Sequence, residues 1–391
     1  MQGIRRRTWA QIDLDAAAHN FKAIKQAADQ AALCCVVKAN GYGHGAVTLA
    51  RLYEGLGADF LAVSNIEEAL QLRRAKIKLP VLVLGYTPHE CAGLLSKYSI
   101  IQCVYSYEYA KELSAAAVKA DCTVLVHIKL DTGMGRIGFD YRENDDFPEE
   151  IIETCNLKGL CVEGIFTHFA SADEGDGGDD FTKSQYSRFV FAAKRVEEYC
   201  GHRIIRHCAN SAAILDHTDM SLDMVRAGIV LYGLAPSDTM RKKLDLKPVM
   251  SLKTVVSHVK TIHKGDFVSY GRTFMADRDM TIATLPIGYA DGFPRKAGRG
   301  YCMTSNGQSL PIIGRVCMDQ TMLDVTGTDI KVGDEVTVFG AQCPSTADDL
   351  AKAADTINYE IVCAVGERVP RFFVKNGEVV EISDSLCNEA E

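Results

Sequence analysis

Short apolar runs alternate with longer amphipathic stretches over roughly the first 240 residues of the chain, the pattern that distinguishes strands from helices. Strands are predicted at residues 8–14, 33–37, 58–63, 80–84, 100–104, 124–130, 164–169, 206–209 and 224–231, and helices at 46–56, 65–74, 89–97, 107–119 and 183–199. A further helix, capped by Asp15, is predicted after the first strand. This alternation favours a closed (β/α)8 barrel, with a doubly wound sheet as the alternative.

The pattern changes near Leu244. From Pro248 on, the segments are short, alternating and interrupted by Gly and Pro, as in VVSHVKTI, TIATLPIG, QSLPIIGRV and EVTVFG, with one predicted helix at 346–354. Such segments are typical of a β domain. We therefore expect an α/β protein with a TIM-type barrel at 1–241 and a mostly β domain at 242–391.

Composition excludes several classes of function. The 43 Lys and Arg against 51 Asp and Glu give a net charge of −8, so no overall basic field would hold nucleic acid or an anionic membrane. The 14 cysteines lack paired metal-ligand spacing and predict buried thiols of a reducing compartment and no metal. With neither a signal-like run nor a membrane-length apolar run, the expected location is the cytoplasm.

Two polar stretches are predicted to be solvated. The basic cluster at 5–7 is expected to be a solvated terminus, and the acidic, Gly-rich segment 173–180 a mobile surface loop.

Lys38 ends an apolar run and begins a glycine-rich segment. The sequence LCCVVKANGYGHG places five apolar residues before this cation and then alternates glycines with Tyr42 and His44. A backbone of this kind can bend closely around a small ligand. A partly buried lysine amine forms a Schiff base with an aldehyde, and pyridoxal phosphate is the commonest such aldehyde. The alternative is a surface lysine that ends a strand.

Several polar residues fall at predicted strand ends, where a barrel builds its catalytic rim. They are Lys38, Arg136, His168, Ser211 and Arg226, with His207 beside them. Ser211 opens a helix and could bind a phosphate together with the amides of Gly228 and Ile229, although a plain N-cap is the alternative. A lone strand histidine is more often a buried core residue, but several such groups on one rim are harder to dismiss.

The segment KLDTGMGRIG carries two further candidates. Arg136 lies among glycines, where its planar fork could hold a substrate carboxylate, unless it is a surface arginine in a turn. Lys129 and Asp131 share one face of a strand, and an ordinary salt bridge is the default interpretation.

The β domain offers three polar or adaptable residues in Gly-rich turns and one more tyrosine. Tyr270, Tyr289 and Met318 lie in VSYGRTF, IGYADGF and GRVCMDQ, and Tyr359 lies in INYEIVC, where a helix is predicted to end and a strand to begin. Ordinary packing is the alternative for each tyrosine.

Taken together, these segments resemble the bacterial pyridoxal-phosphate-dependent alanine racemases. The motifs KANGYGHG, KLDTGMGRIGF, THFASADE, HCANSAA, RAGIVLYG, VSYGRTF, IGYADGFPR, GRVCMDQ and TINYE follow the family's order along almost the whole chain. The resemblance implies a barrel followed by a mostly β domain. It also implies a homodimer that interconverts L- and D-alanine for peptidoglycan.

The resemblance implies a role for each candidate. Lys38 would bind pyridoxal phosphate and act as one base, and Tyr270, donated across a head-to-tail dimer, would act as the base on the opposite face. Residues implied to hold the cofactor phosphate are Tyr42, Ser211, Gly228, Ile229 and Tyr359, while Arg226, with His207 behind it, would face the pyridine nitrogen. His168 would be the partner of the catalytic tyrosine, Arg136 and Met318 would contact the substrate carboxylate, and Tyr289 would lie at the entrance. Lys129 occupies a position that is carbamylated in several members of the family.

Other functions stay open at this stage. A racemase of serine or of broader small amino acids would share most motifs, although Tyr359 favours a methyl side chain. A decarboxylase of basic amino acids shares the barrel but needs a different second domain. A noncatalytic pyridoxal-phosphate-binding regulator resembles the barrel alone, so the motifs around Tyr270 and Met318 argue against it.

Overall fold

The computed structural model describes residues 7–142, 147–298, 300–341 and 344–387. It divides into two compact units. The first, here called the β unit, contains the N-terminal residues to Ala17, the short segment Tyr42–Gly45 and Lys247–Glu391. The second, here called the barrel unit, contains Ala18–Gly41 and Ala46–Leu246.

Eight parallel strands of the barrel unit follow the order β10-β2-β3-β4-β5-β6-β8-β9. Hydrogen bonds from Asp223 N to Arg206 O (3.2 Å) and from Arg226 N to Ala209 O (3.0 Å) join the two ends, which closes the sheet. The predicted (β/α)8 fold is therefore confirmed. The strands are β2 (Ala32–Val36), β3 (Phe60–Val63), β4 (Val81–Val83), β5 (Ile100–Val104), β6 (Val124–Asp131), β8 (Leu160–Phe166), β9 (Ile205–His207) and β10 (Met224–Ala227).

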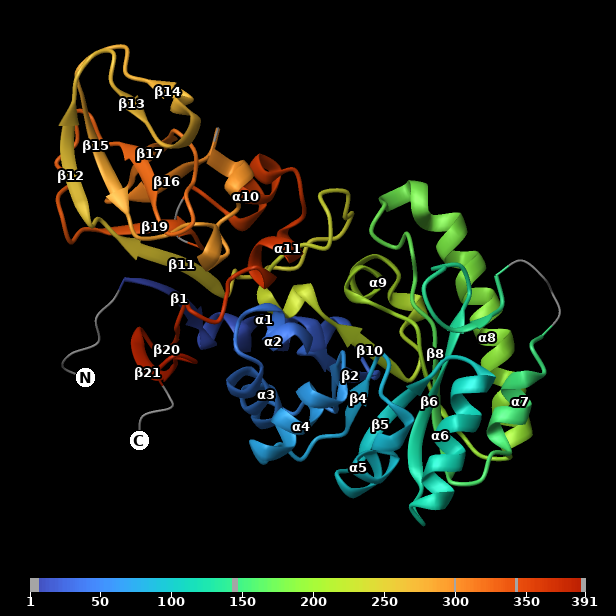
Figure 1. Ribbon diagram of the computed structural model, residues 1–391. Coiled ribbons are helices and arrows are strands. Elements are labelled where there is room, and N and C mark those ends of the chain that lie inside the picture. Colours follow the sequence, from blue (N-terminus) through green and yellow to red (C-terminus); the bar gives the residue numbers. More distant parts are fainter. Residues whose placement is uncertain (1–6, 143–146, 299, 342–343, 388–391) are drawn as a thin grey trace. The chain divides into compact units, whose positions relative to one another are not determined.

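Helices lie around the outside of these strands, as Figure 1 shows for α4, α5, α6 and α8. Their bounds are α3 (Ala46–Gly55), α4 (Ile66–Arg74), α5 (Ala92–Lys97), α6 (Tyr107–Lys119), α7 (Glu150–Cys155), α8 (Asp179–Cys200) and α9 (Ser211–Asp216). The short strand β7 (Phe139–Asp140) extends β6. The strands are almost wholly buried, which explains why they read as continuous apolar runs rather than alternating ones.

The β unit is built on one ten-stranded sheet, in the order β12-β15-β18-β17-β16-β19-β11-β1-β20-β21. The N-terminal strand β1 (Thr8–Asp13) belongs here, because it pairs antiparallel with β11 and parallel with β20. The other strands are β11 (Met250–Val255), β12 (His258–Ile262), β15 (Met280–Leu285), β16 (Cys302–Ser305), β17 (Gln308–Ile313), β18 (Thr321–Asp324), β19 (Glu335–Phe339), β20 (Arg371–Lys375) and β21 (Glu378–Ser383).

A two-stranded ribbon and two helices complete the β unit. The ribbon is β13 (Phe267–Val268) with β14 (Phe274–Met275), and the helices are α10 (Ala347–Ala354) and α11 (Asn358–Cys363). One apolar cluster lies under the ribbon and includes Val268, Ile282 and Met322. The mostly β character predicted for this part of the chain is confirmed.

Several local predictions are wrong. Asp13, not Asp15, caps the first helix α1 (Leu14–Ala27), because its Oδ1 accepts the Ala16 amide at 2.9 Å. The strand predicted at 224–231 ends at Ala227, since the Gly228 amide donates to the Ser211 hydroxyl instead of to a neighbouring strand. Tyr359 lies inside helix α11, because Asn358, Ile361 and Val362 are buried at helical spacing.

Two segments predicted to be solvated are tied down. Arg7 donates to the wholly buried carboxylate of Asp291 at 2.6 Å, while the rest of the basic cluster lies outside the described residues. The segment 173–180 forms a turn, Gly175–Gly178, and the start of α8. Arg241 pairs there with Asp176 and Asp179, both at 2.8 Å. Ion pairs within the barrel unit thus connect this surface segment to Arg241.

Along the described stretches of the chain, every helix is too short or too polar to cross a bilayer.

Candidate active site

Lys38 lies directly beyond the carboxyl end of β2 and begins a left-handed turn. The φ angles of Ala39, Asn40 and Gly41 are +52°, +53° and +63°. Tyr42 continues in the same region with φ +51°. Left-handed conformation costs a residue with a Cβ about 1–2 kcal/mol, so consecutive left-handed residues store strain next to the half-buried Lys38.

Side chains of the barrel unit hold this strained turn. The carboxylate of Glu68, on α4, accepts the Ala39 amide at 2.6 Å and the Ser64 amide at 2.7 Å. Asn40 Oδ1 accepts the Ala46 amide at 2.9 Å, which ties the turn to the start of α3. The backbone after Lys38 is therefore fixed by one charge-assisted hydrogen bond, from Ala39 to Glu68, and one neutral hydrogen bond, from Ala46 to Asn40.

Two glycines predicted to bend around a ligand pack against protein instead. Gly43 has φ +81°, and a Cβ there would overlap the Val362 carbonyl oxygen. Its own carbonyl accepts Arg371 Nε at 3.0 Å. A Cβ on Gly45 would lie 2.6 Å from the Phe373 ring. These glycines let the segment Tyr42–Gly45 pack into the β unit.

Arg226, on β10, is buried and held by neutral acceptors alone. Its Nη1 donates to His207 Nδ1 and to the His207 carbonyl, both at 3.0 Å. Its Nη2 donates to the carbonyls of Thr167 (2.8 Å) and Cys208 (3.2 Å) and to His168 Nδ1 (3.2 Å). None of these bonds uses Nε–H, and no ion pair of Arg226 occurs in the part of the chain that the structure describes. The guanidinium plane is thus fixed by five contacts.

Burial and the neighbouring cation keep the histidines of this cluster neutral. Burial, followed by the charge of Arg226, holds the pKa of His168 and of His207 well below the ordinary value of 6.5. Burial lowers the pKa of Arg226 to about 10, so it stays charged at neutral pH. Because Arg226 only donates, both histidines accept at Nδ1 and carry their proton on Nε2.

Lys129, on β6, is a buried amine near these cations. Burial lowers its pKa to about 7, and the charges of Arg226 and Arg136 act in the same direction. Its Nζ donates to the Leu130 carbonyl at 2.6 Å and lies 5.4 Å from the centre of the Phe166 ring. The default expectation of a Lys129–Asp131 salt bridge is wrong, because Asp131 Oδ1 accepts the amides of the glycine-rich loop.

That loop carries the exposed Arg136. The amides of Gly133 and Gly135 each donate to Asp131 Oδ1 at 3.0 Å, which shapes the turn. Gln185, buried on α8, donates to the Thr132 hydroxyl at 3.2 Å and accepts the Ala170 amide at 2.9 Å. The loops after β6 and β8 are thereby fixed to each other at the carboxyl end of the barrel.

The residues of the predicted phosphate cradle form two groups. In the barrel unit, the Ser211 hydroxyl accepts the Gly228 amide at 2.9 Å, next to Ile229. In the β unit, the buried Tyr42 ring packs on Tyr359 with centroids 6.1 Å apart. Each group is thus held together by contacts within its own unit.

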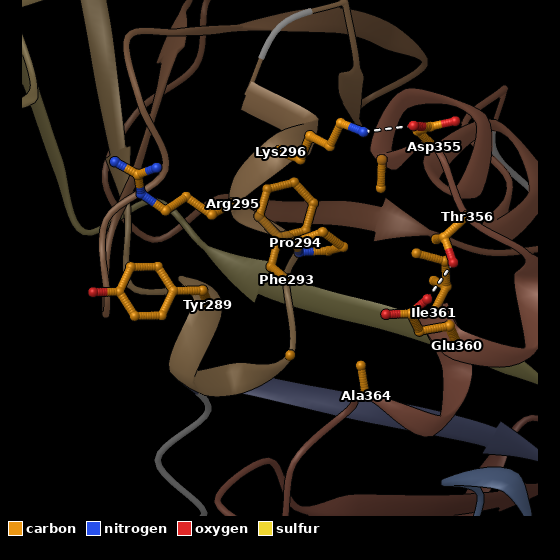
Figure 2. Close-up of a pocket in the computed structure, with 12 residues that line it drawn as sticks. Tyr289, Phe293, Pro294, Arg295, Lys296, Asp355, Thr356, Glu360, Ile361 and Ala364 are labelled. Atoms are coloured by element: carbon orange, nitrogen blue, oxygen red, sulfur yellow. Dashed lines mark hydrogen bonds and ion pairs between the residues drawn. The ribbon is translucent and has the colours of Figure 1, made fainter.

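The remaining candidates lie on the surface of the β unit. Tyr270 and Met318, 69% and 52% exposed, line a cavity of about 540 Å³ beside the ribbon β13-β14. Tyr289, 43% exposed, lines a separate cavity of about 420 Å³. Figure 2 shows its ring on the same side as Arg295, with the Lys296–Asp355 and Thr356–Glu360 contacts further along the wall.

Two residues that matter to this geometry are absent from the sequence predictions. Glu68 reads as an ordinary acidic residue at the start of a helix, and nothing local indicates that it holds Ala39. His127 was detectable in principle, because strand alternation places it on the same face as Lys129 and Asp131.

Comparisons with known proteins agree over both units. The family model described as "Alanine racemase, N-terminal domain" matches residues 12–236, and "Alanine racemase, C-terminal domain" matches 249–373. The alanine racemase of Clostridium tetani is 45% identical over 382 residues, covering 96% of this chain and 98% of that protein. The alanine racemase of Desulfovibrio desulfuricans is 46% identical, with 96% and 100% covered.

Solved structures give the same result. An alanine racemase of Clostridium difficile 630 has a TM-score of 0.91 at 42% identity, covering 98% of this chain and 99% of that one. An alanine racemase of Bacillus anthracis with bound L-Ala-P has a TM-score of 0.91 at 36% identity, with 99% and 100% covered. The fold and these relatives define an isomerase built from a (β/α)8 barrel and a mostly β domain. The chain belongs to the alanine racemase family.

Proposed function

We propose that this protein interconverts L-alanine and D-alanine with pyridoxal phosphate as its cofactor, and that it works in the cytoplasm to supply D-alanine for peptidoglycan. The observation that carries the proposal is the buried Arg226, a cation with an unused Nε–H and no carboxylate partner among the described residues. Such a donor suits a neutral aromatic nitrogen, which accepts a hydrogen bond without taking the proton of a guanidinium.

The other side chains fit the same cofactor. Lys38 lies just beyond the carboxyl end of barrel strand β2, where such barrels place their catalytic groups. The Ser211 hydroxyl accepts the Gly228 amide next to Ile229, and this group of polar atoms would hold the phosphate. Tyr42 and Tyr359 would complete the phosphate contacts from the β unit. Bound pyridoxal phosphate supplies an electron sink that makes the substrate Cα–H acidic.

The chain's own residues then move the proton. Racemisation takes a proton from one face of Cα and returns one to the other, which two opposed bases do more directly than one. Lys38 Nζ would serve one face and the Tyr270 hydroxyl the other, with His168 as the partner of the tyrosine. Arg226 keeps its proton, so the ring nitrogen stays neutral, and this limits side reactions that need deeper electron withdrawal.

Substrate recognition would use the exposed groups at the barrel end and on the β unit. Arg136 and Met318 would bind the substrate carboxylate, and Tyr289 would lie at the entrance. A related structure is described as an alanine racemase of Clostridium difficile 630 in complex with cycloserine. Tyr359 favours a methyl side chain over the hydroxymethyl group of serine.

A modified Lys129 fits its surroundings. A pKa of about 7 leaves much of the amine uncharged at neutral pH, and the uncharged amine is the form that adds carbon dioxide. The resulting carbamate would be an anion among the cations Arg136 and Arg226 and would orient Arg136.

The proposal requires a homodimer with shared active sites. Tyr270 is 69% exposed on a single chain, whereas a catalytic base needs a desolvated site. We infer that the barrel unit of a second copy covers it in a head-to-tail arrangement.

The test is addition of L-alanine to the purified protein in deuterated water. We expect optical rotation to fall towards zero and deuterium to enter at Cα, and we expect Tyr270→Phe to lose about 100-fold or more in this exchange. No loss of rotation together with no α-deuterium would contradict the proposal. Borohydride reduction followed by peptide mapping should place the cofactor on Lys38.

A further inference from the structure

A further buried histidine, His127, lies next to His207 in the interior of the barrel. His127, on β6, has no exposed surface, and its Nδ1 lies 2.9 Å from His207 Nε2. His207 Nδ1 in turn lies 3.0 Å from Arg226 Nη1. The three side chains form one line of hydrogen bonds across the barrel interior, and the proposed mechanism gives His127 no role.

The direction of every proton in this line follows from Arg226. A guanidinium has no acceptor, so His207 Nδ1 must accept from Nη1. Neutral His207 then carries its proton on Nε2 and donates it to His127 Nδ1. His127 is therefore an acceptor at Nδ1, and its own proton lies on Nε2.

The second ring nitrogen of His127, Nε2, lies on the opposite side of the ring from His207. His127 Nε2 is buried without a hydrogen-bond partner within the described residues. The ring fits there only because residue 164 is glycine, since a Cβ at that position would lie 2.7 Å from both Cε1 and Nε2. Burying an N–H without a hydrogen-bond partner is unfavourable, so an apolar side chain at position 127 would give a more stable protein unless the Nδ1 acceptor is needed.

We propose that His127 is a positioning residue: by accepting from His207 Nε2–H it holds the His207 ring in place, and the His207 Nδ1 acceptor in turn orients the Arg226 guanidinium that meets the ring nitrogen of the cofactor. The hydrogen-bond geometry stands by itself, and only the last step rests on the proposed function. Without His127 Nδ1, the buried His207 N–H loses its partner, and the His207 ring is no longer held against Arg226.

Two variants of equal shape isolate the acceptor. Asparagine and leucine carry the same branched group at Cγ, but only asparagine places an oxygen where His127 has Nδ1. His127→Asn and His127→Leu both remove the outer half of the ring, so both create the same cavity. A difference between them reports the hydrogen bond and not the packing.

The first measurement is ¹⁵N NMR of the full-length protein labelled on histidine, with His207 assigned by its loss in His207→Gln. The expected wild-type result is a proton on His207 Nε2 and a coupling across the hydrogen bond to His127 Nδ1. His127→Asn should keep the Nε2–H resonance of His207 at the position of a hydrogen-bonded N–H, and His127→Leu should shift it to that of an N–H without a partner. A wild-type His207 protonated on Nδ1, or an Nε2–H resonance unchanged in His127→Leu, would overturn the proposal.

The second measurement is steady-state racemisation. We expect kcat of His127→Leu to be about tenfold below that of His127→Asn, which corresponds to about 1.4 kcal/mol, with similar KM values. Equal kcat values would overturn the positioning role. If neither variant folds, the wild-type tautomer and coupling still decide the question. If the protein proves not to be a racemase, the NMR result stands or falls independently.

Discussion

Lys129 is a buried amine whose charged form the surroundings disfavour. Its folded-state pKa of about 7 lies below the ordinary 10.5 because of burial. From about pH 7 to 10.5 the unfolded chain therefore holds a proton that the folded chain lacks, so stability rises with pH. Below the folded pKa both states are protonated, and the full cost of the buried charge is present. Stability should thus be lowest on the acid side of this window.

We expect Lys129→Met to remove this dependence. Methionine keeps the length of the side chain and its contact with Phe166. In buffers depleted of carbon dioxide, the unfolding free energy of the wild type should rise relative to the variant by about 1.4 kcal/mol per pH unit between pH 7 and 10. Urea titrations followed by circular dichroism measure it. Parallel pH profiles would show that the lysine is not desolvated.

Some of the candidate site residues could be predicted from the sequence and others could not. Lys38 was predicted because it is a cation at the end of an apolar run, and Arg226 because it lies with His168 and His207 on the rim of the predicted barrel. His127 was not, because its importance lies in a contact with His207, eighty residues away in the chain. Gly164 carries no local sign that it makes room for that ring.

The element next to Lys38 is a left-handed turn, and Glu68 of α4 is its main tether. We expect Glu68→Ala to lower kcat about tenfold or more, because the released turn no longer fixes the direction of the Lys38 side chain. Glu67→Ala is the matched control, since Glu67 is exposed on the same helical turn and contributes equally to the helix dipole. Similar kcat values for both variants, measured by racemisation, would rule out this role for the tether.

The segment Tyr42–Gly45 offers a test of packing in the β unit. Gly43→Ala should destabilise this unit by about 3 kcal/mol more than Gly327→Ala, because the new Cβ would meet the Val362 carbonyl. Gly327 has a similar φ (+76° against +81°) with open space around it, so both variants carry the same left-handed cost.

Fluorescence of Trp9 measures this difference. It is the single tryptophan of the chain and is buried in β1 of the same unit. Equal shifts of the urea midpoint for the two variants would show that Gly43 does not contact Val362.

Elements were predictable where burial alone decides the pattern. The strand predicted at 100–104 is β5 (Ile100–Val104), and the helix predicted at 107–119 is α6 (Tyr107–Lys119). The wrong predictions concern segments whose conformation is decided by tertiary contacts rather than by local pattern. A helix was predicted to end and a strand to begin in INYEIVC, yet Asn358, Ile361 and Val362 are buried at the spacing of helix α11. The left-handed turn after Lys38 depends on Glu68 and Asn40, which no local pattern reveals.

At the scale of the whole molecule, the sequence predicted the barrel and the β part because their hydrophobic periods differ. It did not predict that the first strand pairs within the β unit, since β1 reads like any other apolar strand and its partners β11 and β20 lie far along the chain. Long-range pairing of this kind is set by register and side-chain packing across the sheet, not by local propensity.

Shared active sites make a quantitative prediction about mixed dimers. Lys38→Ala and Tyr270→Phe homodimers each lack one base at both sites and should be inactive. Unfolding the two variants together and refolding them should give heterodimers in which one site has lost both bases and the other has kept both. Random pairing makes about half of the dimers mixed, so the mixture should recover about a quarter of wild-type activity. The control is the same treatment of each variant alone, which should recover none. If both bases of a site came from one chain, every site in the mixture would lack a base, and the activity of the refolded mixture would stay at the level of the separate variants.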